Sequence, residues 1–274
     1  KELGISRPGT LALVIKAVKS LQTKSKSRPI FIDHDPYCFG KILDQLRLKV
    51  MSKEKYEPLS LLDIREGKQD AFAKTVDYYF PGELVQLIVK KELPVDSSIL
   101  SQDQVRIINS WLDEDSCGST TKLLYRASRD GWRAFNFHSK CDNQGPTLTV
   151  IRSTGGYIFG GFCDTAWSSH GCWKTSPKAF LFTLKCYSGL TPTKMRLKDR
   201  NNGKAVYHSV FYGPIFGGGY DIYVCDNANS NSSSYTNVGH TYKCPAGQTG
   251  NTFLTGNNNF QASEVEVFSV QEKE

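Results

Sequence analysis

A histidine, a cysteine and an aspartate lie within five residues of one another at His138, Cys141 and Asp142. A cysteine activated by a histidine is an arrangement used for nucleophilic catalysis, with a third group that orients the imidazole. If residues 132–141 form a helix, His138 and Cys141 are three positions apart and their side chains can touch. Asp142 directly follows Cys141 and is poorly placed to orient the far side of the ring. The spacing therefore argues against a catalytic triad.

Turn chemistry explains the same stretch of sequence more fully. Gly145 can adopt a positive φ and Pro146 cannot continue a helix, so the chain should turn there. Residues 147–153, TLTVIRS, are typical of a strand, and the STGG that ends it is typical of a hairpin turn. Gly160 and Gly161 then indicate either a bulge or a close neighbour. We therefore expect a helix, a turn and a hairpin in place of an active site.

Other motifs for catalysis or metal binding are absent from the sequence. There is no Walker A, G-x-S-x-G, H-E-x-x-H or C-x-x-C pattern, and the five histidines are scattered. Glu264 and Glu266 alternate with apolar residues in SEVEVFSV, which is typical of a strand with an exposed, charged face. We expect no catalytic residue, no metal site and no cofactor.

Eight cysteines occur in the chain, and we interpret them as reduced thiols in the cytoplasm. The first 21 residues lack the pattern of a secretion signal. No apolar run is long enough for a transmembrane helix, so we expect no membrane insertion. The net charge is +7, but the basic residues are scattered, which argues against a nucleic-acid partner.

The sequence pattern changes at Pro94, from helical spacing of apolar residues to short strand-like runs. This change predicts an α+β protein of two domains, residues 1–94 and 95–274. The first is mainly helical, with apolar residues at helical spacing in residues 9–21 and again after Pro36. A further helix should begin after Ser101. From residue 122 onward, eight short strand-like runs separated by turn residues predict a two-sheet antiparallel β-sandwich with short flanking helices.

Several motifs of the second half resemble those of the TLDc domain family over roughly residues 98–272. They are LLYRASRDGWRAFNFHSKCDNQGPTLTVIRSTGGYIFGGFCDTAW, AFLFTLKC, GPIFGGGYDIYVCDNANSNSSSYTNVGHTY and FLTGNNNFQASEVEVFSV, in this order. The resemblance implies a two-sheet β-sandwich, a link to protection against oxidative stress, and binding to subunits of the vacuolar proton-pumping ATPase without an established catalytic mechanism. It also implies that Arg129, Asp130, Gly131, Glu264 and Glu266 matter as surface or scaffold positions.

The first third resembles, less strongly, a BTB domain of the potassium-channel-tetramerisation (KCTD-like) type. The matching segments are RPIFIDHDPYCFGKILDQLR and LLDIREGKQDAFAKTVDYYFPGEL, whereas the family's opening strands are missing before them. The resemblance implies an incomplete unit for homo-oligomerisation or for recruiting a partner through residues 1–94.

These observations favour a non-enzymatic adaptor, in which the first domain self-associates or recruits a partner and the TLDc-like domain binds a target. Candidate binding or motif positions are Arg129, Asp130, Gly131, Asp142, Gly160, Gly161, Glu264 and Glu266. One alternative is a thiol-based antioxidant enzyme or redox sensor, which needs Cys141 or Cys163 to be exposed with a low pKa. Another is a substrate adaptor of a cullin ubiquitin ligase.

Overall fold

The chain divides into two compact units, residues 1–92 and 93–274. The structure is a computed structural model, and no helix among its described residues is both long and apolar enough to cross a membrane. It describes residues 35–51, 58–59, 64–65, 67–80, 88 and 96–271.

Two helices of the first unit are described, α2 (Pro36–Met51) and α3 (Gln69–Tyr79). Asp35 starts α2, because its carboxylate accepts hydrogen bonds from the backbone N–H groups of Tyr37 and Cys38 at 3.0 and 3.2 Å. Both helices contribute to a buried apolar cluster of Cys38, Ile42, Ile64, Phe72, Val76, Phe80 and Ile88. The helix predicted at residues 9–21 lies outside the described residues, and the BTB resemblance stays a prediction.

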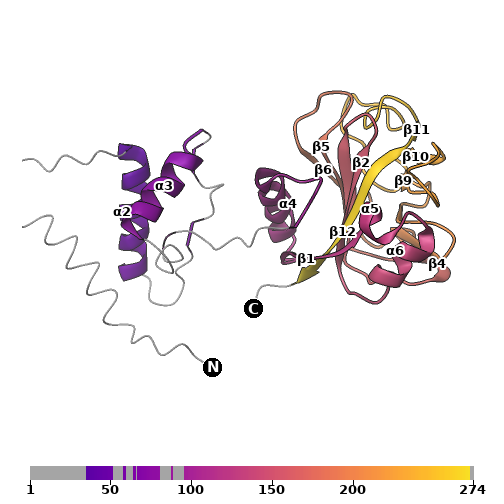
Figure 1. The fold of residues 1–274 in the computed structure, drawn as a ribbon, viewed down its shortest axis with the longest axis horizontal. Coiled ribbons are helices and arrows are strands. Elements are labelled where there is room, and N and C mark those ends of the chain that lie inside the picture. The colour runs from indigo at the N-terminus through magenta and orange to yellow at the C-terminus, as the bar shows by residue number, and fades with distance from the viewer. Residues whose placement is uncertain are drawn as a thin grey trace, which may run out of the picture. The chain divides into compact units, whose positions relative to one another are not determined.

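The second unit is a sandwich of two six-stranded antiparallel sheets, as predicted (Figure 1). The first sheet has the order β1-β12-β2-β3-β5-β6, and the second has the order β11-β10-β9-β8-β7-β4. The strands of the first sheet are β1 (Ser119–Arg126), β2 (Thr147–Ser153), β3 (Ile158–Cys163), β5 (Phe180–Lys185), β6 (Thr193–Arg196) and β12 (Ala262–Gln271). Those of the second are β4 (His170–Lys174), β7 (Val206–Ser209), β8 (Ile215–Phe216), β9 (Ile222–Tyr223), β10 (Ser234–Thr236) and β11 (Asn259–Phe260).

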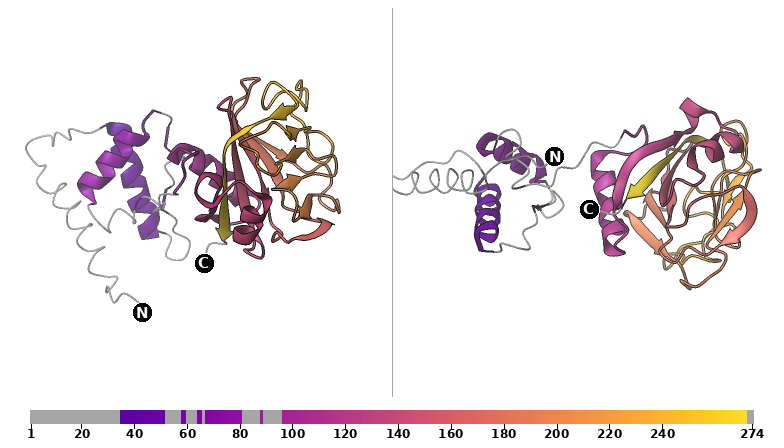
Figure 2. Two further views of the ribbon diagram at one scale, coloured as in Figure 1. Left: turned by 45° about the vertical axis from the view of Figure 1, so that its right-hand side comes forward. Right: turned by 90° about the horizontal axis from the view of Figure 1, so that it is seen from below.

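Among its described residues, 96–271, this unit has three helices: α4 (Gln102–Glu114), α5 (Ala127–Asp130) and α6 (Ala134–Cys141). The helix predicted after Ser101 is confirmed as α4. Its capping box joins Ser101 and Gln104, because each side chain accepts a hydrogen bond from the backbone N–H of the other residue. Helix α4 lies against the first sheet, on the side away from the second sheet (Figures 1 and 2).

Strand β12 is buried on both of its faces, unlike a typical antiparallel strand with one face in water. Val265 and Val267 pack into the core between the two sheets. Phe268 and Val270 pack into a second apolar cluster, which includes Val105, Ile108 and Leu112 of α4. Residues that would otherwise face water on this strand therefore lie beneath the helix and the segment that leads into it.

The hairpin predicted between residues 147 and 162 is confirmed. Strands β2 and β3 pair in antiparallel fashion, and Gly145 and Gly156 both have a φ of +76°. The pairing is regular through Gly160 and Gly161, so they form no bulge. A Cβ atom on Gly161 would lie 2.7 Å from the ring of Phe216, which is a strand residue of the facing sheet. The close-neighbour explanation is therefore the correct one for this glycine.

Candidate functional site

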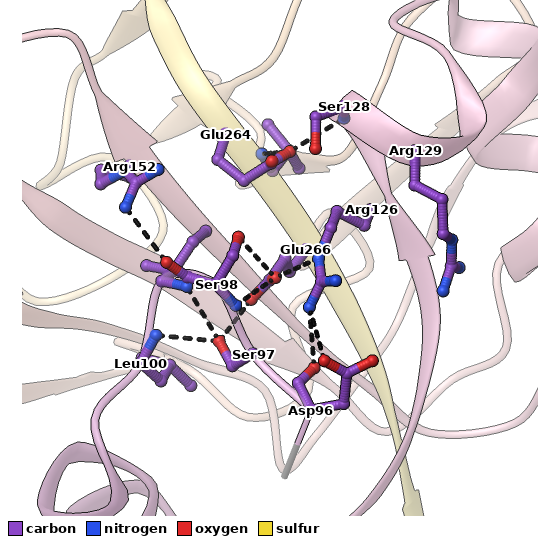
Figure 3. Close-up of polar contacts among 12 residues, drawn as sticks. Asp96, Ser97, Ser98, Leu100, Arg126, Ser128, Arg129, Arg152, Glu264 and Glu266 are labelled. Carbon is purple, nitrogen blue, oxygen red and sulfur yellow. Dashed lines mark hydrogen bonds and ion pairs between the residues drawn. The ribbon is translucent and has the colours of Figure 1, made fainter.

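Glu266 is the centre of a polar cluster that ties residues 96–98 to strand β12 (Figure 3). The side chain is fully buried. Its carboxylate accepts hydrogen bonds from the backbone N–H of Ser98 at 2.8 Å, from the Ser98 hydroxyl at 3.0 Å and from the Ser97 hydroxyl at 2.5 Å. Arg126 adds a charged contact from Nε at 2.7 Å. This buried carboxylate thus has four hydrogen-bond donors, one of them cationic, which compensate for its removal from water.

Two arginines extend the cluster to the main chain of the same segment. Arg126 Nη2 donates to the carbonyl oxygen of Asp96 at 3.0 Å and to its carboxylate at 3.1 Å. Arg152 Nη1 donates to the carbonyl oxygen of Ser98 at 3.1 Å (Figure 3). Residues 96–98 are thus fixed to β1, β2 and β12 together, and we call this set of contacts the Glu266 lock.

The Ser97 hydroxyl also organises the start of the path into α4. It accepts hydrogen bonds from the backbone N–H groups of Ile99 and Leu100, at 3.1 and 2.8 Å. Both of these residues are buried in the cluster beneath α4. The lock therefore sets the direction from which the chain enters the sandwich domain.

Glu264 lies beside the lock but holds a different segment. It is 4% exposed, and its Oε1 atom accepts hydrogen bonds from the backbone N–H groups of Ser128 and Val265, both at 3.1 Å. Because Ser128 is in α5, this carboxylate fastens that short helix to β12. The predicted exposed, charged face at Glu264 and Glu266 is wrong. Strand β12 lies between β1 and β2, and α4, α5 and residues 96–100 cover its outer face.

Arg129 and Asp130 are the last residues of α5 and Gly131 follows directly after it, and their contacts are within the domain. The Asp130 carboxylate accepts from the backbone N–H of Arg126 at 2.9 Å, and contact with the Arg129 guanidinium lowers the pKa of Asp130. Gly131 has a φ of +105°, and a Cβ atom there would lie 2.6 Å from Oδ1 of Asn136. These contacts hold the end of α5 in place, and a binding role for the three positions stays a prediction.

His138 and Asp142 form a pair that excludes Cys141. Asp142 Oδ1 lies 2.8 Å from His138 Nδ1, so the expectation that Asp142 cannot orient the ring is wrong. The other ring nitrogen, Nε2, lies 2.8 Å from the carbonyl oxygen of Ser209 and 3.0 Å from that of Tyr212. Because this second nitrogen faces two carbonyl groups, it is not available to activate a thiol. The pair fastens α6 to the turn after β7.

Cys141 and Cys163 are both fully buried. Burial raises the pKa of the Cys141 thiol far above its ordinary value, and burial raises the pKa of Cys163 to about 12. All eight cysteines are free thiols in the structure. Neither of the two candidates has the exposure and low pKa that the redox hypothesis requires.

Sequence reasoning missed Asp96, Ser97, Ser98, Arg126 and Arg152, which complete the lock. One signal was available, namely a glutamate that alternates with apolar residues in a strand bearing apolar side chains on both faces. A strand of that composition is buried on both sides, and a buried carboxylate needs donors. The donors themselves come from segments up to 169 positions away, which no local pattern connects to Glu266. Among the described residues, no three His, Cys, Asp or Glu side chains are grouped so that they could hold a metal ion.

Comparison with known proteins agrees with the sandwich and its boundaries. The family model of the TLDc domain matches residues 93–271. TBC1 domain family member 24 of Xenopus tropicalis is 35% identical over 72 residues, which are 26% of this chain and 13% of that protein. MTOR-associated protein MEAK7 of Danio rerio is 29% identical over 66 residues, 24% of this chain and 15% of that protein. The matches thus cover a small part of each relative, whereas the family model covers the whole sandwich. The chain belongs to the TLDc domain family.

Proposed function

We propose that the chain is a non-catalytic adaptor whose TLDc domain binds a partner protein. The observation that carries this proposal is that the reactive side chains of the domain are engaged in contacts within its own fold. Glu264, Glu266, His138 and Asp142 all hold one segment of the domain to another, and Cys141 is fully buried. A site for catalysis needs such groups free to meet a substrate. Family membership supports the same role.

The partner that we favour is a subunit of the vacuolar proton-pumping ATPase, reached in the cytoplasm, and the consequence would be protection against oxidative stress. The TLDc resemblance implies this partner, and the sandwich domain that carries the resemblance spans residues 93–271. Residues 1–94 would add homo-oligomerisation or recruitment of a cullin. One relative is named as an MTOR-associated protein, which makes MTOR or its assemblies a second candidate partner.

Biolayer interferometry on the immobilised full chain tests the proposal directly. The analytes are purified peripheral subunits of the vacuolar proton pump, a purified cullin N-terminal domain, and an unrelated acidic protein as the control. Saturable binding of the pump subunits alone supports the favoured partner. Binding of the cullin alone would move the function to ubiquitin ligation, and binding of neither would contradict both assignments.

A peroxide-consumption assay tests the claim that the adaptor is non-catalytic. We expect no turnover by the full chain above the rate of a heat-denatured sample. Turnover that disappears in Cys141→Ser or Cys163→Ser would refute the claim, because it would require a reactive thiolate at a position that is buried in the structure. Light scattering of the intact chain separately shows whether residues 1–94 oligomerise.

A further inference from the structure

Aromatic side chains form a continuous row across the outer face of the second sheet. The residues paired in register across β4, β7, β8, β9 and β10 are Trp173, Tyr207, Ile215, Tyr223 and Tyr235. Residues paired in this way lie on the same face of a sheet. The next register positions, Val206, Phe216 and Ile222, point into the core between the sheets, so the aromatic row faces outward. Strands lie about 4.8 Å apart, which gives the row a length of about 19 Å.

Tyr220 joins the members of this row. Its ring centroid lies 5.8 Å from those of Trp173 and Tyr223, 6.3 Å from that of Tyr207 and 6.2 Å from that of Tyr235. It is also one of the few described residues other than glycine with a positive φ, at 54°. The domain therefore holds a bulky residue in an unfavourable backbone conformation, and this conformation places the Tyr220 ring next to the four aromatic rings of the row.

Ile215 shows that the aromatic rings cover the outer face of the second sheet. It is fully buried and yet lies on the outward register of the sheet, between Tyr207 and Tyr223. The aromatic side chains around it are half-buried. The outer face of an antiparallel sheet is usually polar, whereas here it consists of the apolar side chain of Ile215 with aromatic side chains around it.

The polar atoms of these rings are unpaired. Within residues 96–271, no hydrogen bond joins the hydroxyl groups of Tyr207, Tyr220, Tyr223 or Tyr235, or the indole N–H of Trp173, to another group of the protein. The row thus combines apolar ring faces with a set of free donors, a composition enriched at protein interfaces.

One cation lies beside the row without an anionic partner among the described residues. The side chain of exposed Lys204 runs alongside Gly218, two residues before Tyr220. In the described part of the TLDc domain, no carboxylate lies within ion-pair distance of this lysine. A partner segment that covers the row should therefore place a carboxylate near Lys204.

We propose that this surface, which we call the aromatic row, binds an acidic, proline-rich extended segment of a partner protein. A polyproline II segment packs its rings against aromatic side chains, and its backbone carbonyls are free to accept from hydroxyl and indole donors. At about 3.1 Å per residue, about six residues span the row. A single unpaired lysine is too few for a nucleic acid, whose binding depends on several phosphate contacts. The inference rests on the proposed adaptor function and names the surface that performs it.

Fluorescence anisotropy on the full chain tests the proposal, with a labelled synthetic peptide that has a run of prolines between glutamates. We expect saturable binding that weakens about tenfold or more in Tyr220→Ala and about fivefold in Lys204→Glu. Tyr223→Phe keeps the ring and removes one donor, so it should have a smaller effect. The matched controls are Tyr187→Ala and Lys185→Glu, both exposed and outside the row, and they should leave binding unchanged. Lys204→Glu changes an exposed side chain, so it remains informative if Tyr220→Ala fails to fold.

Three results with the peptide overturn the proposal: no saturable binding, binding that the row variants do not weaken, or preference for the same peptide with its prolines replaced by alanine. Preferential binding of single-stranded oligothymidine, or burial of the row in a dimer seen by light scattering, would overturn it in favour of another occupant. If the proton-pump subunits bind wild type and Tyr220→Ala equally, the adaptor function stands and the aromatic row is not its surface.

Discussion

Arg126 and Glu266 are direct partners across the β1–β12 pair, with Nε of the arginine 2.7 Å from Oε1 of the glutamate. They are 140 positions apart in the sequence. Glu266 is fully buried and the Arg126 side chain is 17% exposed. The attraction between such charges mainly offsets the cost of removing them from water, so the pair matters most when one partner is lost.

Removal of the Glu266 carboxylate should destabilise the domain strongly. In Glu266→Ala, Arg126 and the donors of Ser97 and Ser98 lose their acceptor, and we expect a loss of about 3–5 kcal/mol in the free energy of unfolding. Urea unfolding of the full chain measures this. Glu114→Ala is the matched control, because Glu114 is 51% exposed and its ion pairs should contribute less than about 1 kcal/mol. Equal losses in the two variants would contradict a structural role for the Glu266 lock.

A methyl group at residue 161 should not be tolerated between the sheets. A Cβ atom on Gly161 meets the Phe216 ring at 2.7 Å and the Leu181 side chain at 2.9 Å. We expect Gly161→Ala to lower the free energy of unfolding by about 1–3 kcal/mol, because a packed core resists added volume. Gly203→Ala is the control, since its nearest neighbour would be 4.0 Å away. A neutral result at residue 161 would show that the two sheets can separate at little cost.

Thiol reactivity should follow burial. Cys172 and Cys244 are half-buried, whereas Cys141 and Cys163 are fully buried. Burial raises the pKa of Cys141, Cys163 and, among the half-buried pair, Cys244. Under native conditions iodoacetamide should modify Cys172 and Cys244 first, and mass spectrometry of the digested protein identifies the modified residues. Early modification of Cys141 would reopen the redox hypothesis.

Stability should decrease at acidic pH because of His208. Burial lowers the pKa of its imidazole to about 4, and Nδ1 already contacts the Ser168 hydroxyl at 3.0 Å. The unfolded chain binds the proton near pH 6.5, so between these two values only the unfolded state is protonated, and stability falls as the pH falls. The loss approaches about 3 kcal/mol near the lower value.

Urea unfolding at about pH 7 and about pH 4.5 measures this dependence. His208→Gln should reduce the difference between the two conditions, whatever it does to stability at neutral pH. His240→Gln, at an exposed histidine, should leave the difference unchanged. The contrary outcome is an unchanged pH dependence in His208→Gln, which would assign it to other groups.

Local sequence patterns predicted most of the elements of the sandwich. The strand TLTVIRS coincides with β2, and helix α4 begins one residue after its predicted cap. Three of the four missed strands, β8, β10 and β11, have two or three residues, too few to show a period of two. The fourth, β4, contains Gly171 in a positive φ, a residue that usually marks a turn.

The candidate site was only half predictable, for a physical reason. The sequence pointed to Glu264 and Glu266, but it predicted that both side chains are exposed to solvent, because the alternation in SEVEVFSV indicates one exposed face. Alternation reports two faces and does not say what covers each of them. Helix α4 and residues 96–100 cover the second face, and only the tertiary structure shows that they do.

The Glu266 lock also determines how the domain would respond to a pull. The chain enters at residues 96–98, which are fastened to Glu266, and leaves after Gln271, only five positions further along the same strand. Tension applied between the two ends would load the side-chain contacts of Glu266 before it reached the β1–β12 ladder. Under tension, these side-chain contacts would therefore break first, while the strands of both sheets remain paired.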